Sequence, residues 1–411
     1  MSITRIFGTH DEGTLGQLQD VATRAAYTAI MADGHRGYVM PIGGVAAYRD
    51  QVSVVGVGFD IACGNAAIRT DLTTTDLADM GHLIGLAETI QEKISFGIGR
   101  RNESDDAPVD DPLFNDPAWD VLPQAANKQN FQGKARSQLG TVGGGNHYVD
   151  VFVDEQDRIW VGVHFGSRGF GHGVASGFLA LGQGKPWNER VPEQETLFNL
   201  SDPLGEAYWA MMSLAGRYAY AGREWVARKV VRLLGGTEQE LVHNHHNFAW
   251  KERHFGEDLI VIRKGATPAF PGQKGFVGGS MGDDSVILEG TAVTDPDAPG
   301  ETLVHAEQVD AMFSTVHGAG RVMSRTAAKG KGWRKRSGPT SPGAVTRQMM
   351  SEWTKAKGVI VRGGDVDESP HVYRRLPDVL AEQGSTINVL HTLRPLIVVM
   401  ADPETRDPYK D

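Results

Sequence analysis

Residues 143–169, GGGNHYVDVFVDEQDRIWVGVHFGSRG, carry the clearest secondary-structure pattern in this chain of 411 residues. Two β-rich runs, 148–153 and 159–165, flank a short acidic turn, which is typical of an antiparallel hairpin. His147 then stands at the start of the first strand and His164 at the end of the second, so both imidazoles lie at the same end of the pair. This placement suits ligands of one metal site, whereas a histidine taken alone is more often an ordinary surface or core residue.

Similar runs elsewhere predict a mixture of strands and helices. Strands are expected at residues 52–59, 66–70, 259–263, 286–288, 359–362 and 396–400, and helices at residues 76–93, 203–234, 319–328, 342–355 and 370–382. The expected fold class is therefore mixed α/β. The polar motifs spread from residue 33 to residue 321, which indicates one domain over residues 1–411 with a single site. The turn-rich residues 102–120 and 291–302 are predicted to be loop insertions.

Composition limits the class of protein. The chain is 40% hydrophobic and 22% charged, which is typical of a globular protein with a sizeable core. No run approaches the roughly 18 to 20 apolar residues that cross a bilayer, and the N-terminus lacks a basic region followed by an apolar run. We therefore expect a cytoplasmic protein without a membrane partner. Cys63 is the one cysteine, which excludes an intramolecular disulfide.

The formal net charge of -10 argues against a protein that coats nucleic acid over a long footprint, because neutralising phosphates needs clustered cations. A local nucleic-acid site remains compatible with that charge. The densest basic run, residues 329–336, places Trp333 among five cations, where an unpaired base could stack. A solvated loop is the alternative interpretation of this run.

Asp60 and Cys63 stand three residues apart in the glycine-bounded segment 58–64, on a turn that follows an apolar run. A carboxylate and a thiolate facing one ion form a mixed hard and soft pair, which suits Zn, Co or Mn. The alternative is a buried structural cysteine beside a capping aspartate. Residues 243–247, HNHHN, offer three imidazoles, of which at most one or two could point to one site. A polar loop is the alternative there.

His317 lies among small residues in the segment 317–321, HGAGR, before a predicted helix. A helix N-terminus can bind phosphate through free backbone N–H groups. A neutral imidazole there could attack phosphorus, with Arg321 and metal ions stabilising the charge of the transition state. Residues 263–266 and 278–282 add cations and a small-residue loop that suit a nucleotide cradle, but neither has the spacing of a Walker A loop or a dinucleotide fingerprint.

Eight blocks, taken in order, resemble the motifs of RtcB-type RNA ligases, and the likeness covers most of the chain. They are residues 33–37, 58–64, 143–147, 164–169, 245–247, 263–266, 278–282 and 317–321. Any single block would be a weak signal, whereas eight in order are highly specific. The resemblance implies an RtcB-like single-domain α/β fold with a central dimetal site.

The resemblance also implies a reaction that uses GTP and two divalent ions, usually Mn²⁺. His317 would attack the α-phosphorus of GTP, the guanylyl group would pass to an RNA 3′-phosphate, and an RNA 5′-hydroxyl would then displace GMP from this RNA-ppG intermediate. A 2′,3′-cyclic phosphate end would first be opened to the 3′-phosphate. An archease-type activator is an expected partner of some members of the family.

The roles implied for single residues follow from the matched blocks. Cys63 would bridge both ions, with Asp60 and His147 completing one coordination set and His164 and His246 the other. Asp33 would orient His317, and Arg168, Lys264 and Arg321 would hold phosphates. The nucleotide pocket would comprise Asn146, His147, Asp150, His246, Asn247, Gly278, Gly279, Ser280, Met281, Ser285, His317, Gly318, Ala319 and Gly320.

Two positions depart from the family pattern. Asp150 stands where the family usually has glutamate, and Met400 stands where a lysine near the C-terminus contacts guanine. Methionine cannot donate a hydrogen bond to a guanine carbonyl. Two other functions stay open at this point: a metal-dependent phosphoesterase that opens cyclic phosphates without ligation, and a noncatalytic RNA repair accessory protein.

Overall fold

The computed structural model describes residues 3–403, apart from residues 78, 295–301 and 335–337. The strands are β1 (Ile3–Ile6), β2 (Tyr27–His35), β3 (Ile42–Tyr48), β4 (Gln51–Ser53), β5 (Gly64–Thr73), β6 (Tyr148–Val153), β7 (Arg158–Phe165), β8 (Leu197–Asn199), β9 (Glu238–His245), β10 (Asn247–His254), β11 (Glu257–Lys264), β12 (Ala266–Pro268), β13 (Lys274–Val277), β14 (Ser285–Gly290), β15 (Val293–Thr294), β16 (Thr302–Leu303), β17 (Ser314–Val316), β18 (Gly330–Arg334), β19 (Gly338–Pro342), β20 (Ile360–Arg362) and β21 (Ile387–Met400). The α-helices are α1 (Glu12–Ala22), α2 (Val54–Val57), α3 (Met80–Lys93), α4 (Lys128–Gln138), α5 (Arg168–Gly182), α6 (Pro203–Leu233), α7 (Ala306–Asp310), α8 (Arg325–Lys329), α9 (Arg347–Ala356) and α10 (Leu376–Gln383).

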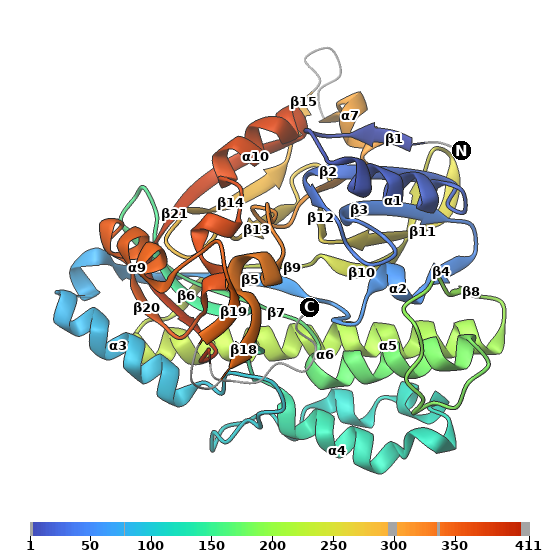
Figure 1. Ribbon diagram of the computed structural model, residues 1–411, viewed down its shortest axis with the longest axis horizontal. Coiled ribbons are helices and arrows are strands. Elements are labelled where there is room, and N and C mark those ends of the chain that lie inside the picture. Colours follow the sequence, from blue (N-terminus) through green and yellow to red (C-terminus); the bar gives the residue numbers. More distant parts are fainter. Residues whose placement is uncertain (1–2, 78, 295–301, 335–337, 404–411) are drawn as a thin grey trace.

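Two sheets organise the fold, which is mixed α/β as predicted. The smaller sheet has the strand order β1-β2-β3-β11-β10, and the larger has the order β13-β14-β21-β6-β7-β5-β9, with β20 paired to β21 (Figure 1). The side chain of Asn244 on β9 donates to Lys274 O (3.0 Å) and accepts from Phe276 N (3.2 Å) on β13. These bonds bring the two edge strands of the larger sheet together, so the sheet curves into a near-barrel.

The predicted hairpin is confirmed. Strands β6 and β7 are antiparallel neighbours, and Tyr148 pairs with His164. His147, one residue earlier, therefore lies beside His164 at the end of the larger sheet. Both faces of the hairpin are buried, because Val149, Val151 and Val163 pack in one hydrophobic cluster and Phe152 and Trp160 pack in another.

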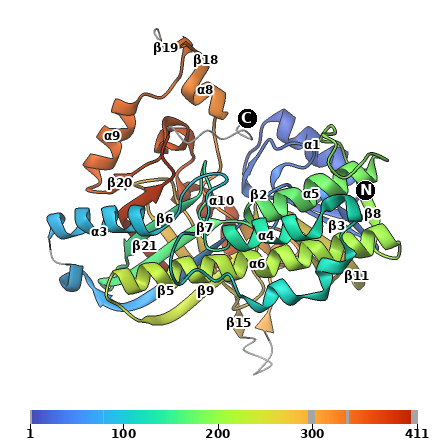
Figure 2. The ribbon, with the colours of Figure 1, turned by 90° about the horizontal axis from the view of Figure 1, so that it is seen from below.

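Helices cover the larger sheet. The long helix α6 packs on β5 and β7, while α3 packs on β20 and β21. Helices α5 and α4 lie beyond α6, as the view from below shows (Figure 2). Pro203 is at the start of α6, in the first turn where no intrahelical partner for its nitrogen is needed, so the prediction of a helix over residues 203–234 is confirmed within one residue. Within the described residues, no helix combines the length and apolar composition that a membrane span requires.

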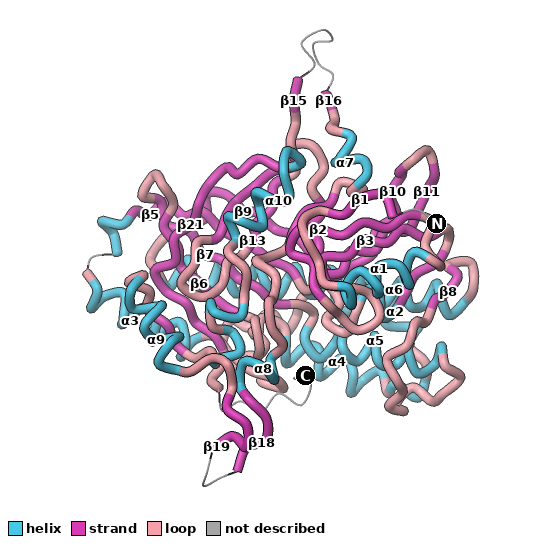
Figure 3. The backbone as a smooth tube through the Cα atoms, turned by 45° about the horizontal axis from the view of Figure 1, so that its top comes forward, coloured by secondary structure: helices cyan, strands magenta, loops and turns pink. Residues whose placement is uncertain are grey.

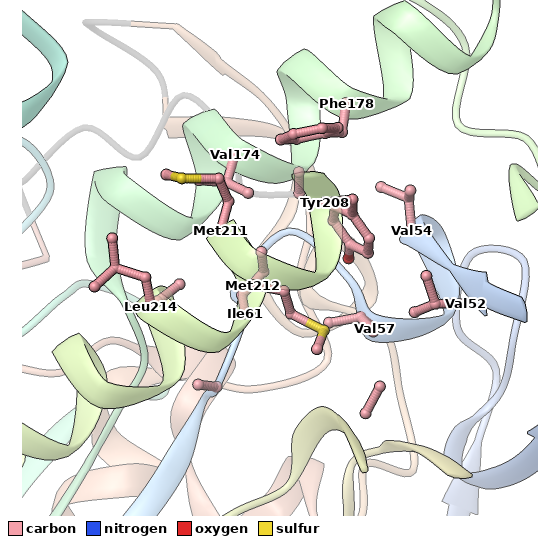
Figure 4. Packing of buried hydrophobic residues seen from close by; sticks show 14 of the residues in the cluster. Val52, Val54, Val57, Ile61, Val174, Phe178, Tyr208, Met211, Met212 and Leu214 are labelled. Atoms are coloured by element: carbon pink, nitrogen blue, oxygen red, sulfur yellow. The ribbon is translucent and has the colours of Figure 1, made fainter. Parts of the chain in front are cut away.

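The predicted strand over residues 52–59 is wrong beyond its first residues. β4 ends at Ser53, whose hydroxyl accepts from Gly56 N (2.8 Å) and caps the short helix α2. The apolar residues of this segment are buried against α5 and α6, where Val54 and Val57 lie near Tyr208 and Met212 (Figure 4). A continuous apolar run does not distinguish a buried strand from a buried helical turn. In this segment the Ser53 cap favours the helical turn.

The C-terminal helices begin later than predicted. No helix starts at residue 319: Gly320 has φ 73°, and α8 begins only after Ser324, whose hydroxyl caps it by accepting from Ala327 N (3.1 Å). α9 begins at Arg347 rather than 342, and α10 at Leu376 rather than 370, after a 3₁₀ turn over Pro370–Val372. His317 is therefore not at a helix N-terminus, and its phosphate-binding potential must come from the loop itself.

The predicted insertions have little regular structure. Residues 102–120 are irregular apart from the 3₁₀ helices Pro112–Asn115 and Pro117–Val121. Residues 291–302 contribute the paired strands β15 and β16, with 295–301 outside the described part of the chain. The hairpin β18–β19 also projects from the body (Figure 3). It holds most of the basic run 329–336, of which residues 335 and 336 are not described.

A buried ion pair ties the smaller sheet to the strand that precedes His317. Arg263 on β11 is fully buried and bonds Glu252 on β10 through two nitrogens (2.8 and 2.9 Å). Its Nε also donates to Ser314 Oγ (2.7 Å) on β17. Burial by itself raises the pKa of Glu252, but the charge of Arg263 and the hydrogen bonds from His254 and Arg263 outweigh it and lower that pKa to about 2.

Replacing Arg263 with methionine should reduce the free energy of unfolding by about 3–5 kcal/mol, because Glu252 loses its charged partner and is left with the hydrogen bond to His254. Urea denaturation at neutral pH measures this change. The matched control is Arg253→Met, which removes an exposed pair with Asp258 and should cost at most about 1 kcal/mol. Equal losses in the two variants would contradict the prediction. In the parent protein the contribution of Glu252 is present above its ordinary pKa of 4.5 and is lost as the pH falls toward 2.

Candidate functional site

A cavity of about 610 Å³ lies where the two sheets meet. Its walls come from segments far apart in sequence: the ends of β2, β6, β7 and β21, the junction of β9 and β10, the loop before β14, and the loop after β17. Most of the predicted site residues line it: Asp60, Cys63, Asn146, His147, Asp150, His164, His246, Asn247, Gly278, Gly279, Ser280, Met281, His317, Gly318, Ala319, Gly320 and Arg321. The single site expected from the motifs is thus a common cavity.

Cys63 is the centre of a cluster of potential metal ligands. Its sulfur lies 3.7 Å from His147 Nε2 and 3.6 Å from His164 Nε2. His147 Nε2 is in turn 3.0 Å from Asp60 Oδ2. The side chains form two groups that share Cys63, one with Asp60 and His147 and the other with His164 and His246.

Sheet register brings these side chains together. Gly64, directly after Cys63, pairs with Phe165 on β7 and with His245 on β9. Cys63, His164 and His246 therefore stand at the same end of three adjacent strands, and His147 joins them from the neighbouring β6. The three-imidazole segment contributes only His246 to the cavity, in agreement with the expectation that at most one or two could face one site.

The donor set fits divalent ions. Ligands at about 2.0–2.3 Å from a tetrahedral ion are separated from one another by about 3.5 Å, which matches the sulfur-to-nitrogen distances around Cys63. His246 Nδ1 is buried and has no hydrogen-bond partner in the described part of the chain, an expensive state that an ion or a ligand would relieve. Asn65 Oδ1 lies 2.6 Å from His164 Nδ1 and fixes that ring, as the outer partner of a ligating histidine does.

Charge states in the cluster also suit metal binding. Burial lowers the pKa of His164 and of His246 well below the ordinary histidine value, so both rings stay neutral. Burial raises the pKa of Asp60, but the hydrogen bond and charge of His147, together with Arg168, outweigh it and hold that pKa at about 2. Burial and the neighbouring Asp60 raise the pKa of Cys63, so a thiolate here requires cations beside it.

A buried arginine holds the backbone that carries two of these ligands. Arg223 on α6 is fully buried and donates through Nη1 to Ala62 O (2.8 Å) and Phe165 O (2.6 Å). Its Nε and Nη2 reach His243 Nε2 and His245 Nδ1, each at 2.8 Å. No sequence pattern points to this residue, because an arginine in a long helix is usually solvated. The two histidines left out of the cavity thus belong to its hydrogen-bond network.

His317 is oriented by a buried carboxylate. Asp33 is fully buried, and its Oδ2 accepts from His317 Nδ1 (2.6 Å), His317 N (3.0 Å) and Gly318 N (3.3 Å). With Nδ1 donating, Nε2 carries the lone pair. The His317 and His246 rings are 4.9 Å apart between centroids, so the candidate nucleophile adjoins the metal-ligand cluster.

An apolar slot leads away from His164. Tyr148 stacks on His164 with ring centroids 5.4 Å apart, and Met281, Val398 and Met400 form a buried cluster beside Tyr148. Asp150 also lines the cavity, and its Oδ1 is buried without a hydrogen-bond partner among the described residues. Burial, opposed by the Val399 amide, raises the pKa of Asp150 well above its ordinary value. An apolar surface beside the Asp150 carboxyl group suits a planar aromatic ring whose edge carries a polar group that can bond the carboxyl group.

Two arginines that line the cavity are already paired. Arg321 donates to Tyr373 OH (3.0 Å) and lies 3.5 Å from Glu368 Oε2. Arg325, which sequence reasoning missed, bonds Glu368 and lies 3.0 Å from Asp367 Oδ2. Both arginines line the cavity, and their ion pairs hold the guanidinium groups in place. This arrangement suits them to position phosphate groups.

Four predicted site residues lie behind the lining. Asp33 acts through His317, and Ser285 Oγ accepts from Gly279 N (2.9 Å), which shapes the 278–282 loop. Lys264 Nζ donates to Val55 O (3.0 Å), and burial lowers its pKa to about 8. Arg168 Nη1 is 3.5 Å from His147 Nδ1, behind a candidate metal ligand.

Comparison with known proteins gives a consistent result. The family model described as tRNA-splicing ligase RtcB matches residues 17–401. The chain is 31% identical to the RNA-splicing ligase RtcB of Escherichia coli, over 91% of this chain and 90% of that protein. It is 28% identical to the tRNA-splicing ligase RtcB of Thermococcus kodakarensis, over 93% and 90% of the two chains. It is 31% identical to the RNA-splicing ligase RtcB homolog 2 of Entamoeba dispar, over 90% and 79%.

Replacing Cys63 with alanine should abolish high-affinity binding of both divalent ions, because the two ligand groups share this sulfur. His147→Ala should remove one ion and leave the other. Inductively coupled plasma mass spectrometry of protein dialysed against Mn²⁺ measures the ratio of metal to protein, with His82→Ala, an exposed histidine outside the cavity, as the control. A Cys63→Ala protein that keeps two ions would contradict the assignment.

Proposed function

Because the chain belongs to the RtcB family of RNA-splicing ligases, we propose that it joins RNA 3′-phosphate or 2′,3′-cyclic phosphate ends to 5′-hydroxyl ends with GTP and Mn²⁺. The observation that carries this proposal is the position of His317, which is bonded by Asp33 and lies next to the Cys63 ligand cluster. An RNA ligase needs a group that can hold an activated nucleotide. An imidazole held by Asp33 beside a cluster of potential metal ligands meets that need.

Asp33 makes His317 a directed nucleophile. The carboxylate accepts from Nδ1–H and so fixes both the tautomer and the plane of the ring. Nε2 attacks the α-phosphorus of GTP, an N–P bond forms, and pyrophosphate leaves. The RNA 3′-phosphate then displaces His317 from phosphorus to give RNA-ppG, and the 5′-hydroxyl of the second strand displaces GMP. A cyclic end is hydrolysed to the 3′-phosphate beforehand.

Two Mn²⁺ ions, when held by Asp60, Cys63, His147, His164 and His246, supply Lewis-acid stabilisation of the charge on the phosphoryl oxygens. Asn65 and Arg223 keep the ligand-bearing segments in place. The slot formed by Tyr148, Asp150, Met281 and Met400 takes the base, and the loop 278–282 approaches the sugar and phosphates through backbone N–H groups. Arg321 places a phosphate, and Arg168 and Lys264 support the walls from behind.

A His317→Ala variant should form no covalent nucleotide adduct. Parent protein incubated with α-labelled GTP and Mn²⁺ should retain label that is stable in alkali and released by acid, as a phosphoramidate is. The control His82→Ala should label like the parent. Absence of label from the parent under Mn²⁺, Co²⁺ and Zn²⁺ would reject nucleotidyl transfer and favour the phosphoesterase, which would still open a cyclic phosphate.

Met400→Lys should increase the preference for GTP over ATP by about tenfold or more, because an ammonium group in the slot can donate to the guanine carbonyl and pair with Asp150. The initial rates of labelling with α-labelled GTP and ATP give the ratio. Met400→Leu keeps the slot apolar and serves as the control. An unchanged ratio in Met400→Lys would place the base elsewhere.

A further inference from the structure

The turn between β2 and β3 exposes an arginine and an aromatic ring at the mouth of the cavity. Arg36 and Tyr38 are both exposed, Tyr38 to 45%, and both line the cavity. Neither is needed to hold the nucleotide slot or the Cys63 cluster, which lie on other walls. An exposed cation beside an exposed aromatic ring is the combination that single-stranded nucleic acids bind, through a phosphate and a stacked base.

This turn is held rigidly. The side chain of Gln17 on α1 accepts from Gly37 N (3.0 Å) and donates to Gly37 O (2.8 Å) and to Tyr38 O. A Cβ atom at Gly37 would lie 2.4 Å from Met40 O, so the turn requires glycine there. Arg36 and Tyr38 are therefore presented on a fixed backbone, which lowers the entropy lost when a ligand binds.

The turn is also coupled in space to the nucleophile. β2 carries Asp33, which bonds His317, and Arg36 follows Asp33 by three residues. A strand that contacts Arg36 and Tyr38 would thus lie at a fixed distance from His317. The Lys264 ammonium is 5.8 Å from the centre of the Tyr38 ring and adds positive charge at the base of this wall.

The balance of charge around the cavity makes Arg36 distinctive. Arg321 and Arg325 lie close to Glu368 and Asp367, so their charges are largely neutralised. Arg36 has no ion pair within the described part of the chain. In a protein with net charge -10, an exposed cation without an ion pair at the edge of the cavity is available to an RNA phosphate.

We propose that Arg36 and Tyr38 form a subsite for the unpaired nucleotide next to the RNA break, with Tyr38 stacking on its base and Arg36 bonding its backbone phosphate. The proposal rests on the proposed function, which supplies RNA as the substrate. Stacking accepts any base, so the subsite fixes the position of the strand without selecting sequence.

The test measures RNA binding separately from nucleotidyl transfer. A fluorescein-labelled single-stranded RNA ending in 3′-phosphate is titrated with each protein, and anisotropy gives the dissociation constant at several salt concentrations. Tyr38→Ala should weaken binding by about 5- to 150-fold, whereas Tyr38→Phe should bind like the parent. Arg36→Ala should weaken binding and reduce the slope of log affinity against log salt by about 0.7.

Two matched variants control for general effects. Val389→Ala truncates another exposed apolar side chain, one that lies outside the cavity lining, and Arg253→Ala removes one positive charge from the exposed end of β10. Both should bind RNA like the parent. Losses in these controls equal to those of Tyr38→Ala and Arg36→Ala would overturn the subsite, as would unchanged binding in Tyr38→Ala and Arg36→Ala.

Labelling with α-labelled GTP distinguishes failure of the subsite from failure of the proposed function. Tyr38→Ala and Arg36→Ala should still acquire label on His317, since they act at the RNA end. Loss of label in the parent would reject the proposed function, and the anisotropy series would still decide whether this turn binds RNA. Weak RNA binding with intact labelling in both variants supports the subsite.

Discussion

The pairing of Gly64 with strands on both of its sides is the constraint on which the site depends. A Cβ atom at residue 64 would lie 2.1 Å from Asn244 O and 2.9 Å from His245 Cα, so only glycine permits this close approach. That approach brings the ends of β5, β7 and β9 together and thereby joins Cys63, His164 and His246. Arg223 fills the space behind them and bonds the carbonyls of Ala62 and Phe165. A single desolvated guanidinium thus fixes the spacing of residues that are a hundred positions apart in sequence.

Local features of the fold could be predicted from sequence, and features that depend on tertiary packing could not. The β6–β7 hairpin and helix α6 follow from patterns within the segments themselves, and both are confirmed. The strand predicted over residues 52–59 was wrong because an apolar run is equally compatible with a buried turn of helix. The cap at Ser53 is a weak signal in sequence. The prediction of a helix from residue 319 was wrong because Gly320 adopts a left-handed backbone conformation, which bends the chain beside Asp33.

The same distinction applies to the site. Glycine-flanked polar motifs identified most of the cavity lining, because close backbone approach requires glycine wherever the partner lies. Sequence patterns did not identify Arg223, Asn65 and Arg325. Each of them bonds a partner more than forty residues away in the chain, and only the structure shows these partners. Ser285 was expected in the nucleotide pocket but lies behind its lining, where it bonds Gly279 N. The ordered motifs therefore predict which residues come together at the cavity. Which of them line the cavity and which lie behind the lining depends on packing.

The charged groups that line the cavity are of two kinds, a buried carboxyl group beside an apolar cluster and arginines that are paired with carboxylates. Among the described residues Asp150 has no ion pair, and it lies beside the apolar cluster that contains Met281, Val398 and Met400. Arg321 and Arg325 line the same cavity, and their guanidinium groups are held by Glu368 and Asp367, which permits phosphate contact without an excess of free positive charge. His317 lines the same cavity, and Asp33 holds its ring and its backbone nitrogen with one oxygen atom. Because one carboxylate oxygen holds both the ring and the backbone nitrogen, the His317 side chain and its loop keep a fixed orientation in the cavity.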